Sequence, residues 1–346
     1  MSSLKRIEMM KGAKKIVEVC GDTKPGENAM ILTDTNCFHM AEVVAAAAHS
    51  MGAKITIVVM TPGKIHNHPV PEVIGAAMLK ADVTFSVTTF TVTTTKAVIE
   101  ARKLGMRWVN MPAFTEDMLI RGGIEADFLK YKDIVNEVAE RIQSGKEAIY
   151  TTEKGTNLKL KIGRPAIRSW SIASSAEGEP HGCFIPCINA AVSPYENSAE
   201  GVIVVDGSIN CPGIGEGEGD LLREPIKLTV KKGYVTEIEG GSEADKLRDF
   251  LASYEDQKNG HNVYNIAELS VHTNRSSKLT GNMMDDESAY EVGHIGIGAN
   301  IGFADDCKIE APLHLDYMIK KPSLKIDGKV LLDKGKLPPK ILALEK

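Results

Sequence analysis

The first half of the chain alternates short apolar runs with segments of helical character. The apolar, β-rich runs are AMILTDT (29–35), KITIVVM (54–60), VTFSVTT (83–89) and RWVNMP (107–112). The helical segments between them are AEVVAAAAHSMG (41–52), PEVIGAAMLKA (71–81) and TTKAVIEARKLG (94–105). Apolar strands separated by helices of about three turns are typical of βαβ units, so this half predicts an α/β domain with a doubly wound, mostly parallel sheet. The sheet carries no GxGxxG or GxxxxGK motif, so a nucleotide cofactor is not expected.

The pattern changes near residue 150, where apolar and polar residues begin to alternate. Alternation is seen in NLKLKI (157–162), GVIVVDGSI (201–209) and PIKLTVKKGYVTEIEGG (225–241), and one amphipathic helical segment is EADKLRDFLASYE (243–255). Alternating runs joined by hairpin-like turns are typical of antiparallel sheets. We therefore expect two domains, an α/β domain at 1–150 and a β-rich α+β domain at 151–346.

Composition and charge exclude several classes of partner. A chain of 346 residues, with 43% hydrophobic and 25% charged residues, is long enough for two domains of common size. The net charge of -5 and the scattered basic residues argue against nucleic acid as the main partner. The chain has no segment of roughly 18 apolar residues that would span a membrane, and no apolar core of a signal peptide. We therefore expect a cytoplasmic protein that acts on a small molecule.

Ionisable side chains gather in apolar surroundings within the last eighty residues. Three β-like segments bring in Glu268 and His272, then His294, then His314 and Asp316. In the run APLHLDY, residues two apart on a strand point to the same face, so His314 and Asp316 are expected to project side by side. Imidazoles and carboxylates that converge from adjacent strands suit a borderline divalent metal such as Zn, Fe, Mn or Co. The sequence thus predicts a metal site in the second domain.

The glycines of GHIGIGAN (293–300) lie within this constellation. Glycine keeps side chains off the neighbouring strand positions, which lets a substrate or another backbone approach closely. A bulged or kinked strand is the alternative explanation, and the two explanations are compatible.

At this point the residues resemble a known family. The ordered series SAEGVIVVDGSI, IEGGSEADKLRDFL, NIAELSVHTN, GHIGIGAN, LHLDYMI and SLKIDGKVLLDKGKL resembles the aminopeptidase T group of metallo-aminopeptidases. It is also similar to the 2,5-dihydroxypyridine 5,6-dioxygenases, which are iron enzymes built on the same scaffold. GENAMILTDT and GMRWVNMPAFTEDML extend the resemblance over nearly the whole chain. The resemblance further implies a homo-oligomer.

The resemblance to the peptidases implies a set of metal ligands: Glu268, His294, and the closing pair His314 and Asp316. The peptidases carry one further glutamate, and the matching stretch IPCINAAVSP offers Asn189. A neutral amide cannot replace an anionic bridge between two metal ions, so one metal is expected. In the dioxygenase branch, a histidine stands at the position of Glu268 and no metal ligand stands at that of His294. The chain therefore lies between the two branches.

His272 occupies a position where the relatives usually have a small residue. It is open to three interpretations: an additional ligand, a proton shuttle, or a histidine on the protein surface. We favour the surface histidine.

Two reactions and one non-catalytic role follow. We favour a hydrolase of amide or peptide bonds, in which one divalent ion (Zn, Mn or Co) activates water and the catalytic residues are Glu268, as general base, and His294. The alternative is a ring-cleaving dioxygenase with Fe(II) held by His294, His314 and Asp316. The third is a metal-stabilised protein that binds a small molecule without turnover. The expected substrate is a small molecule or a short peptide.

Overall fold

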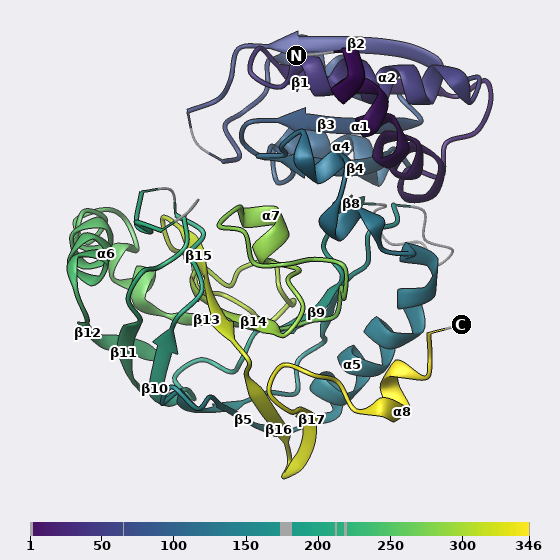
Figure 1. Ribbon diagram of the computed structural model, residues 1–346. Helices are drawn as coiled ribbons and strands as arrows, with labels where there is room; N and C mark the ends of the chain where they lie inside the picture. The colour runs from purple at the N-terminus through teal and green to yellow at the C-terminus, as the bar shows by residue number, and fades with distance from the viewer. Residues whose placement is uncertain (1–2, 65, 174–181, 212, 218–219, 346) are drawn as a thin grey trace. The chain divides into compact units, whose positions relative to one another are not determined.

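The computed structural model describes residues 3–64, 66–173, 182–211, 213–217 and 220–345 (Figure 1). The chain divides into two compact units, Met1–Leu129 with Trp170–Cys187, and Lys130–Ser169 with Ile188–Lys346. This division differs from the single boundary that we expected at residue 150. Helix α5 (Lys132–Ser144) contacts strands of the second unit, and the chain then returns to the first unit to add one more strand there. An excursion of this kind leaves no mark on the pattern of apolar residues.

The first unit is built on a five-stranded parallel sheet in the order β2-β1-β3-β4-β8. Its strands are β1 (Asn28–Asp34), β2 (Lys54–Met60), β3 (Val83–Thr88), β4 (Arg107–Pro112) and β8 (Gly182–Phe184). Its helices are α1 (Ser3–Lys15), which runs into a π-helical turn at Ile16–Cys20, then α2 (Phe38–Ser50), α3 (Glu72–Met78) and α4 (Lys96–Lys103). The chain winds outward from β1 to β2 and then back to β3, as in doubly wound folds. The predicted α/β architecture is confirmed.

Alternation along β1 explains how the core of this unit forms. Met30 and Leu32 point to one face, where they pack with Ile74 and Met78 of α3 and with Trp108 of β4. All five side chains are buried because each apolar face of a parallel sheet must be covered by helices.

The second unit contains two antiparallel sheets. The seven-stranded sheet has the order β12-β11-β10-β6-β5-β16-β17, and the five-stranded sheet has the order β15-β14-β13-β9-β7. The seven strands are β5 (Glu147–Thr151), β6 (Asn157–Lys161), β10 (Glu200–Val205), β11 (Ile226–Lys231), β12 (Tyr234–Glu239), β16 (Ser323–Ile326) and β17 (Lys329–Leu332). The five are β7 (Ile167–Ser169), β9 (Asn189–Val192), β13 (Ile266–His272), β14 (Val292–Gly298) and β15 (His314–Lys320). The β-rich second half is thus confirmed.

Few helices accompany these sheets. They are α5, α6 (Ser242–Ala252), α7 (Met283–Asp286) and α8 (Pro339–Leu342), and α5 packs on β7 and β9. In the part of the chain that the structure describes, none of the helices is both long and apolar enough to cross a bilayer.

Strands β13, β14 and β15 lie side by side in Figure 1 and form one edge of the five-stranded sheet. Every residue of β13 and β14 is buried, so both faces of these strands are covered. The apolar face carries the row Leu269, Ile295 and Tyr317, in register across the three strands. The residues between them point to the opposite face, where the polar side chains of the last eighty residues gather.

Candidate metal centre

The antiparallel register brings the four predicted ligands together. Glu268 on β13 pairs with Gly296 on β14, and Gly296 pairs with Asp316 on β15, so the three residues form one row across the sheet. His294 and His314 each precede a member of this row by two residues and therefore point to the same face. This arrangement confirms that His314 and Asp316 project side by side.

The ring nitrogens of both histidines face both carboxylates. Nε2 of His294 lies 3.0 Å from Oε1 of Glu268 and 3.5 Å from Oδ1 of Asp316. Nε2 of His314 lies 3.2 Å from Oε2 of Glu268 and 3.2 Å from the same Oδ1 of Asp316. Ligand atoms of Glu268, His294 and Asp316 all lie within 4.8 Å of one another. We call Glu268, His294, His314 and Asp316 together the ligand cluster.

Gly296 lets two members of the ligand cluster pack closely against the backbone of β14. A Cβ atom added there would lie 2.8 Å from Cβ of Glu268 and 2.8 Å from Nε2 of His314. Those distances are shorter than real Cβ contacts, so any side chain at this position would displace the ring of His314. The missing side chain and the mixed nitrogen and oxygen donors fit a divalent metal ion. The assignment of the four residues as its ligands stays a prediction.

The charges of the cluster reinforce one another. Burial opposes protonation of His294, but the carboxylates of Asp316 and Glu268 outweigh it and raise its pKa to about 9. The same opposing effects leave the pKa of His314 well above its usual value. Burial would raise the pKa values of Glu268 and Asp316, yet the neighbouring histidines lower both. Without a metal, the cluster is therefore a set of ion pairs between imidazolium and carboxylate groups.

Nδ1 of His294 and Nδ1 of His314, the ring nitrogens that do not face the carboxylates, each make a hydrogen bond. Nδ1 of His314 lies 2.7 Å from the carbonyl oxygen of Ala299, to which it donates. Nδ1 of His294 lies 2.8 Å from Nε2 of His272, and Nδ1 of His272 lies 3.2 Å from the carbonyl oxygen of Ala289. Such bonds fix the ring orientation of metal-binding histidines.

Our interpretation of His272 as a surface histidine was wrong. The side chain is 1% exposed, because β13 is covered on both faces and not on one alone. Its Nδ1 contacts a backbone carbonyl and its Nε2 contacts Nδ1 of His294, the nitrogen of that ring that does not face the carboxylates, so this geometry does not support an additional ligand either. Burial, followed by the charge of His294, lowers the pKa of His272 well below its usual value.

Two residues beside the cluster were missed by sequence reasoning. Asn210 donates a hydrogen bond to Oε1 of Glu287 at 2.8 Å, and its side chain also hydrogen-bonds Asp316. Burial, and then the charge of Asp316, raises the pKa of Glu287 to about 8. Glu287 stands in the acidic stretch MMDDE, where nothing in the sequence distinguishes it from its neighbours. Asn189 pairs with His272 across β9 and β13 and donates to the backbone carbonyl of Glu287.

The cluster reaches solvent on one side. The side chain of His314 is 25% exposed, whereas those of Glu268 and Asp316 are 10% exposed and that of His294 is 4% exposed. The ring of Phe303 stacks on His314, with 5.4 Å between the ring centroids. A ligand would therefore approach the cluster from the side of His314.

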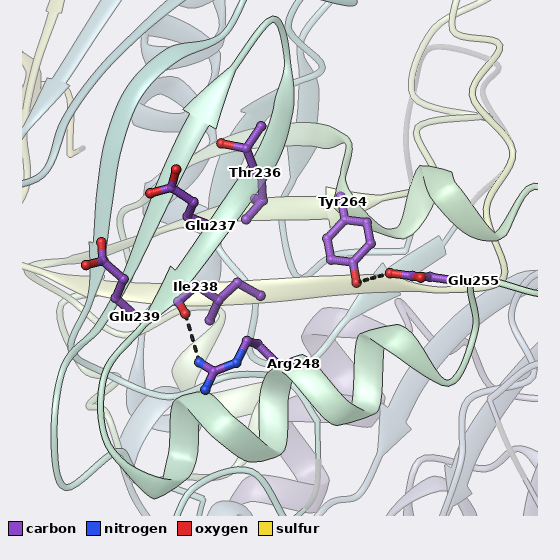
Figure 2. A pocket seen from close by; sticks show the side chains of 8 residues that line it. Thr236, Glu237, Ile238, Glu239, Arg248, Glu255 and Tyr264 are labelled. Carbon is purple, nitrogen blue, oxygen red and sulfur yellow. Dashed lines mark hydrogen bonds between the residues drawn. The ribbon is translucent and has the colours of Figure 1, made fainter.

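A separate pocket of about 570 Å³ lies beside edge strand β12 and helix α6 (Figure 2). Figure 2 shows Arg248 donating to the carbonyl of Ile238 and the hydroxyl of Tyr264 donating to Glu255. The residues that line this pocket include no member of the ligand cluster. Its size alone therefore does not make it the candidate site.

Comparison with known sequences connects this chain to one family. A family model described as NicX, 2,5-dihydroxypyridine 5,6-dioxygenase, matches residues 8–339. A 2,5-dihydroxypyridine 5,6-dioxygenase from Pseudomonas putida strain KT2440 is 30% identical over 152 residues. That alignment spans 41% of this chain and 40% of the relative, so the chain covers less than half of that protein's length.

Two solved structures share the fold over nearly the whole chain. The 2,5-dihydroxypyridine dioxygenase from Pseudomonas putida KT2440 matches with a TM-score of 0.78 and 18% identity, covering 96% of this chain and 98% of that one. Wild-type AmpT from Thermus thermophilus matches with a TM-score of 0.70 and 14% identity, covering 96% and 99%. At these identities the likeness shows a common fold. The resemblance inferred from the sequence motifs is confirmed.

Proposed function

Because the chain belongs to the 2,5-dihydroxypyridine 5,6-dioxygenase family, we propose that it is a mononuclear iron(II) dioxygenase that opens a hydroxylated heteroaromatic ring. The observation that carries the proposal is the position of Asp316. Its Oδ1 lies 3.5 Å from Nε2 of His294 and 3.2 Å from Nε2 of His314. Two histidines and one carboxylate, with further positions open, form the ligand set of non-haem iron oxygenases.

His294, His314 and Asp316 would hold the ion, with Glu268 beside them. This set differs from the one that the resemblance to the dioxygenases implies, in which a histidine stands at the position of Glu268. Here His294, whose Nε2 lies 3.0 Å from Oε1 of Glu268, would supply that second imidazole from the neighbouring strand. Iron(II) bound there would supply the redox chemistry by which O2 reacts with an electron-rich ring. The buried side of the cluster excludes water, and the exposed edge of His314 admits the substrate. A dihydroxypyridine of the kind named for the relatives is the substrate class that we propose.

Two carboxyl groups are suited to move protons for such a substrate. Glu268 has a lowered pKa and is ionised at neutral pH, so its oxygens can accept a proton from a ring hydroxyl. Glu287 has a pKa raised to about 8 and therefore holds a proton at neutral pH, with its Oε1 fixed by Asn210. A group in that state can return a proton to the opened ring.

Hydrolysis of an amide or peptide bond is the second candidate, and the position of Glu268 supports it. Each oxygen of this carboxylate faces a different histidine, at 3.0 Å and 3.2 Å. A fourth ligand, and a second anionic one, suits a redox-inactive ion such as Zn²⁺, and a carboxylate that does not ligate can act as general base. The sequence motifs favoured this reaction, whereas the family that the whole chain matches favours ring cleavage. We therefore place hydrolysis second.

The exposure of His314 also bears on the third interpretation, a protein that binds a metal and a small molecule without turnover. Structural metal sites have closed ligand shells, whereas catalytic sites keep an open position. The partial exposure of His314 supports an open position and thus an enzyme.

Metal content and substrate turnover test the proposal together. The protein is purified without oxygen or chelators, its metals are measured by elemental mass spectrometry, and O2 uptake is followed with 2,5-dihydroxypyridine. About one iron per chain with substrate-dependent O2 uptake is the expected result. Bound zinc or manganese with release of amino acids from short peptides, and no O2 uptake, would replace it with hydrolysis.

A further inference from the structure

We propose that His272 is a positioning residue that sets the tautomer of His294 and thereby its affinity for the metal. The inference rests on the proposed function in one respect, since it requires His294 to be a metal ligand. It adds a residue to which the family resemblance assigned no role. It also predicts the metal affinity of the protein and the position of two protons in the metal-loaded protein, neither of which depends on turnover.

Two hydrogen bonds link the carbonyl of Ala289 to His272 and His272 to His294. The carbonyl determines which atom donates in each of them. A carbonyl oxygen can only accept, so Nδ1 of His272, at 3.2 Å from the oxygen of Ala289, must carry a proton. In a neutral imidazole the other nitrogen is then an acceptor. Nε2 of His272 therefore accepts from Nδ1 of His294, which lies 2.8 Å away.

The opposite arrangement is unfavourable. If Nε2 of His272 donated to His294, a neutral His272 would present an unprotonated Nδ1 to the oxygen of Ala289, and two lone pairs would face each other. Ala289 is itself buried, and its carbonyl also accepts from the backbone N–H of Val292, so it cannot turn away without breaking that bond. The backbone therefore determines the tautomer of His272, and His272 determines that of His294.

The consequence appears at the opposite side of the ring of His294. His294 keeps its proton on Nδ1 and directs Nε2 toward Glu268 and Asp316, at 3.0 Å and 3.5 Å, so the proton that a metal ion displaces is the one on Nε2. That nitrogen is the one whose lone pair a metal would take. His314 obtains the same result directly, because its Nδ1 donates to the carbonyl of Ala299. The two histidines thus have equivalent outer partners, one direct and one relayed through a second histidine.

The test compares two substitutions of His272 by anaerobic titration with Co²⁺, followed by visible absorption. His272→Leu fills the space but cannot accept a hydrogen bond, and the dissociation constant for Co²⁺ should rise about 10- to 100-fold, as is usual when an outer partner is lost. His272→Gln offers an amide oxygen near the position of Nε2 and should retain most of the affinity. Ser270→Ala is the control, because Ser270 lies in register with His294 and its buried hydroxyl has no hydrogen-bond partner in the structure. It should bind Co²⁺ like the wild type.

A second readout reports the tautomer itself. Long-range ¹H–¹⁵N correlation spectra of Zn²⁺-loaded protein labelled in histidine should show a proton on Nδ1 of His294 and on Nδ1 of His272. In His272→Leu the Nδ1 proton of His294 should exchange faster with solvent. If that variant fails to fold, the wild-type spectrum decides, since a proton on Nε2 of His272 would overturn the proposal.

The outcomes separate this inference from the proposed reaction. Wild-type affinity in a folded His272→Leu, or an equal loss in His272→Gln and His272→Leu, would overturn the positioning role. A wild type that binds Co²⁺ in a His272-dependent manner but consumes no O2 would support the positioning role and refute ring cleavage. A wild type that binds none of Co²⁺, Zn²⁺ and Fe²⁺ would overturn both.

Discussion

Substitution of Gly296 by alanine tests whether the close packing of the ligand cluster against this glycine is needed to bind a metal ion. The added Cβ would lie 2.8 Å from Nε2 of His314 and 2.9 Å from its Cε1. To restore an ordinary contact of 3.4 Å, the ring must retreat by about 0.6 Å. Ligand groups must be held within about 0.5 Å of their working geometry. The expected result is therefore a loss of metal affinity of at least about tenfold.

The cost in stability should be moderate. Overpacking of a closed interior costs about 1–3 kcal/mol. The His314 side chain is 25% exposed and can yield toward solvent, but Cβ of Glu268, also 2.8 Å from the added Cβ, is fixed to the buried strand β13, so the cost should fall within that range and not below it. Metal affinity is measured by titration with Co²⁺, and stability by thermal unfolding of the metal-free protein.

Gly293→Ala is the matched control, because Gly293 lies on the same strand but faces the opposite side of the sheet. Its added Cβ would lie 2.6 Å from the hydroxyl of Tyr150 and 3.0 Å from the backbone oxygen of Ser270. This variant should lose at least as much stability as Gly296→Ala and should keep the wild-type metal affinity. Equal losses of affinity in the two variants, or none in Gly296→Ala, would refute the reasoning.

Four further predictions concern charge and protonation in and beside the cluster. Asp316→Asn should lower metal content to background and destabilise the metal-free protein by about 3 kcal/mol, the lower end of the range for breaking a buried ion pair, because buried His294 and partly exposed His314 lose one of their two anionic partners and keep Glu268; retention of metal by elemental mass spectrometry would contradict this. Burial lowers the pKa of His294, but Asp316 outweighs it and the pKa is raised to about 9. A metal ion must displace the proton on this histidine, so metal affinity should rise up to about tenfold per pH unit for each proton displaced, between about pH 7 and 9. The stabilisation of the metal-free protein by protonated His294 should be complete below about pH 6.5 and be lost as the pH rises through about 9, whereas a flat profile of unfolding against pH would argue against it. Glu287→Gln mimics a permanently protonated carboxyl group, so it should retain metal but slow O2 uptake about 10²- to 10⁴-fold, and unchanged turnover would exclude Glu287 as the proton donor.

Part of the site could be predicted from local periodicity. A strand places residues two apart on one face, and this rule alone brings His314 beside Asp316. The row of Glu268, Gly296 and Asp316 depends instead on the register of three strands, with a bulge after Ile266. Register is determined by pairing across the sheet, which the sequence of a single strand does not specify. The sequence could therefore only suggest that these side chains converge, and the register of β13, β14 and β15 in the structure shows that they do.

Burial on both faces of a strand is the other feature that periodicity conceals. Along β13, Leu269 and Val271 alternate with Ser270 and His272, as on a strand with one solvent-exposed face. All four residues are nevertheless buried. The alternation thus separates an apolar core from a polar interior, not from solvent. This is why His272 was misjudged and why Glu287, which comes from the loop after α7, was not anticipated.

Incorporation of labelled oxygen tests the proposed reaction most directly. The protein is loaded anaerobically with iron(II), mixed with 2,5-dihydroxypyridine and exposed to ¹⁸O2, and the product is analysed by mass spectrometry. A dioxygenase predicts a ring-opened product that contains both labelled atoms, and no such product from Asp316→Asn. A product without label, or an intact ring after exposure of the iron-loaded protein to substrate and ¹⁸O2, would contradict the assignment.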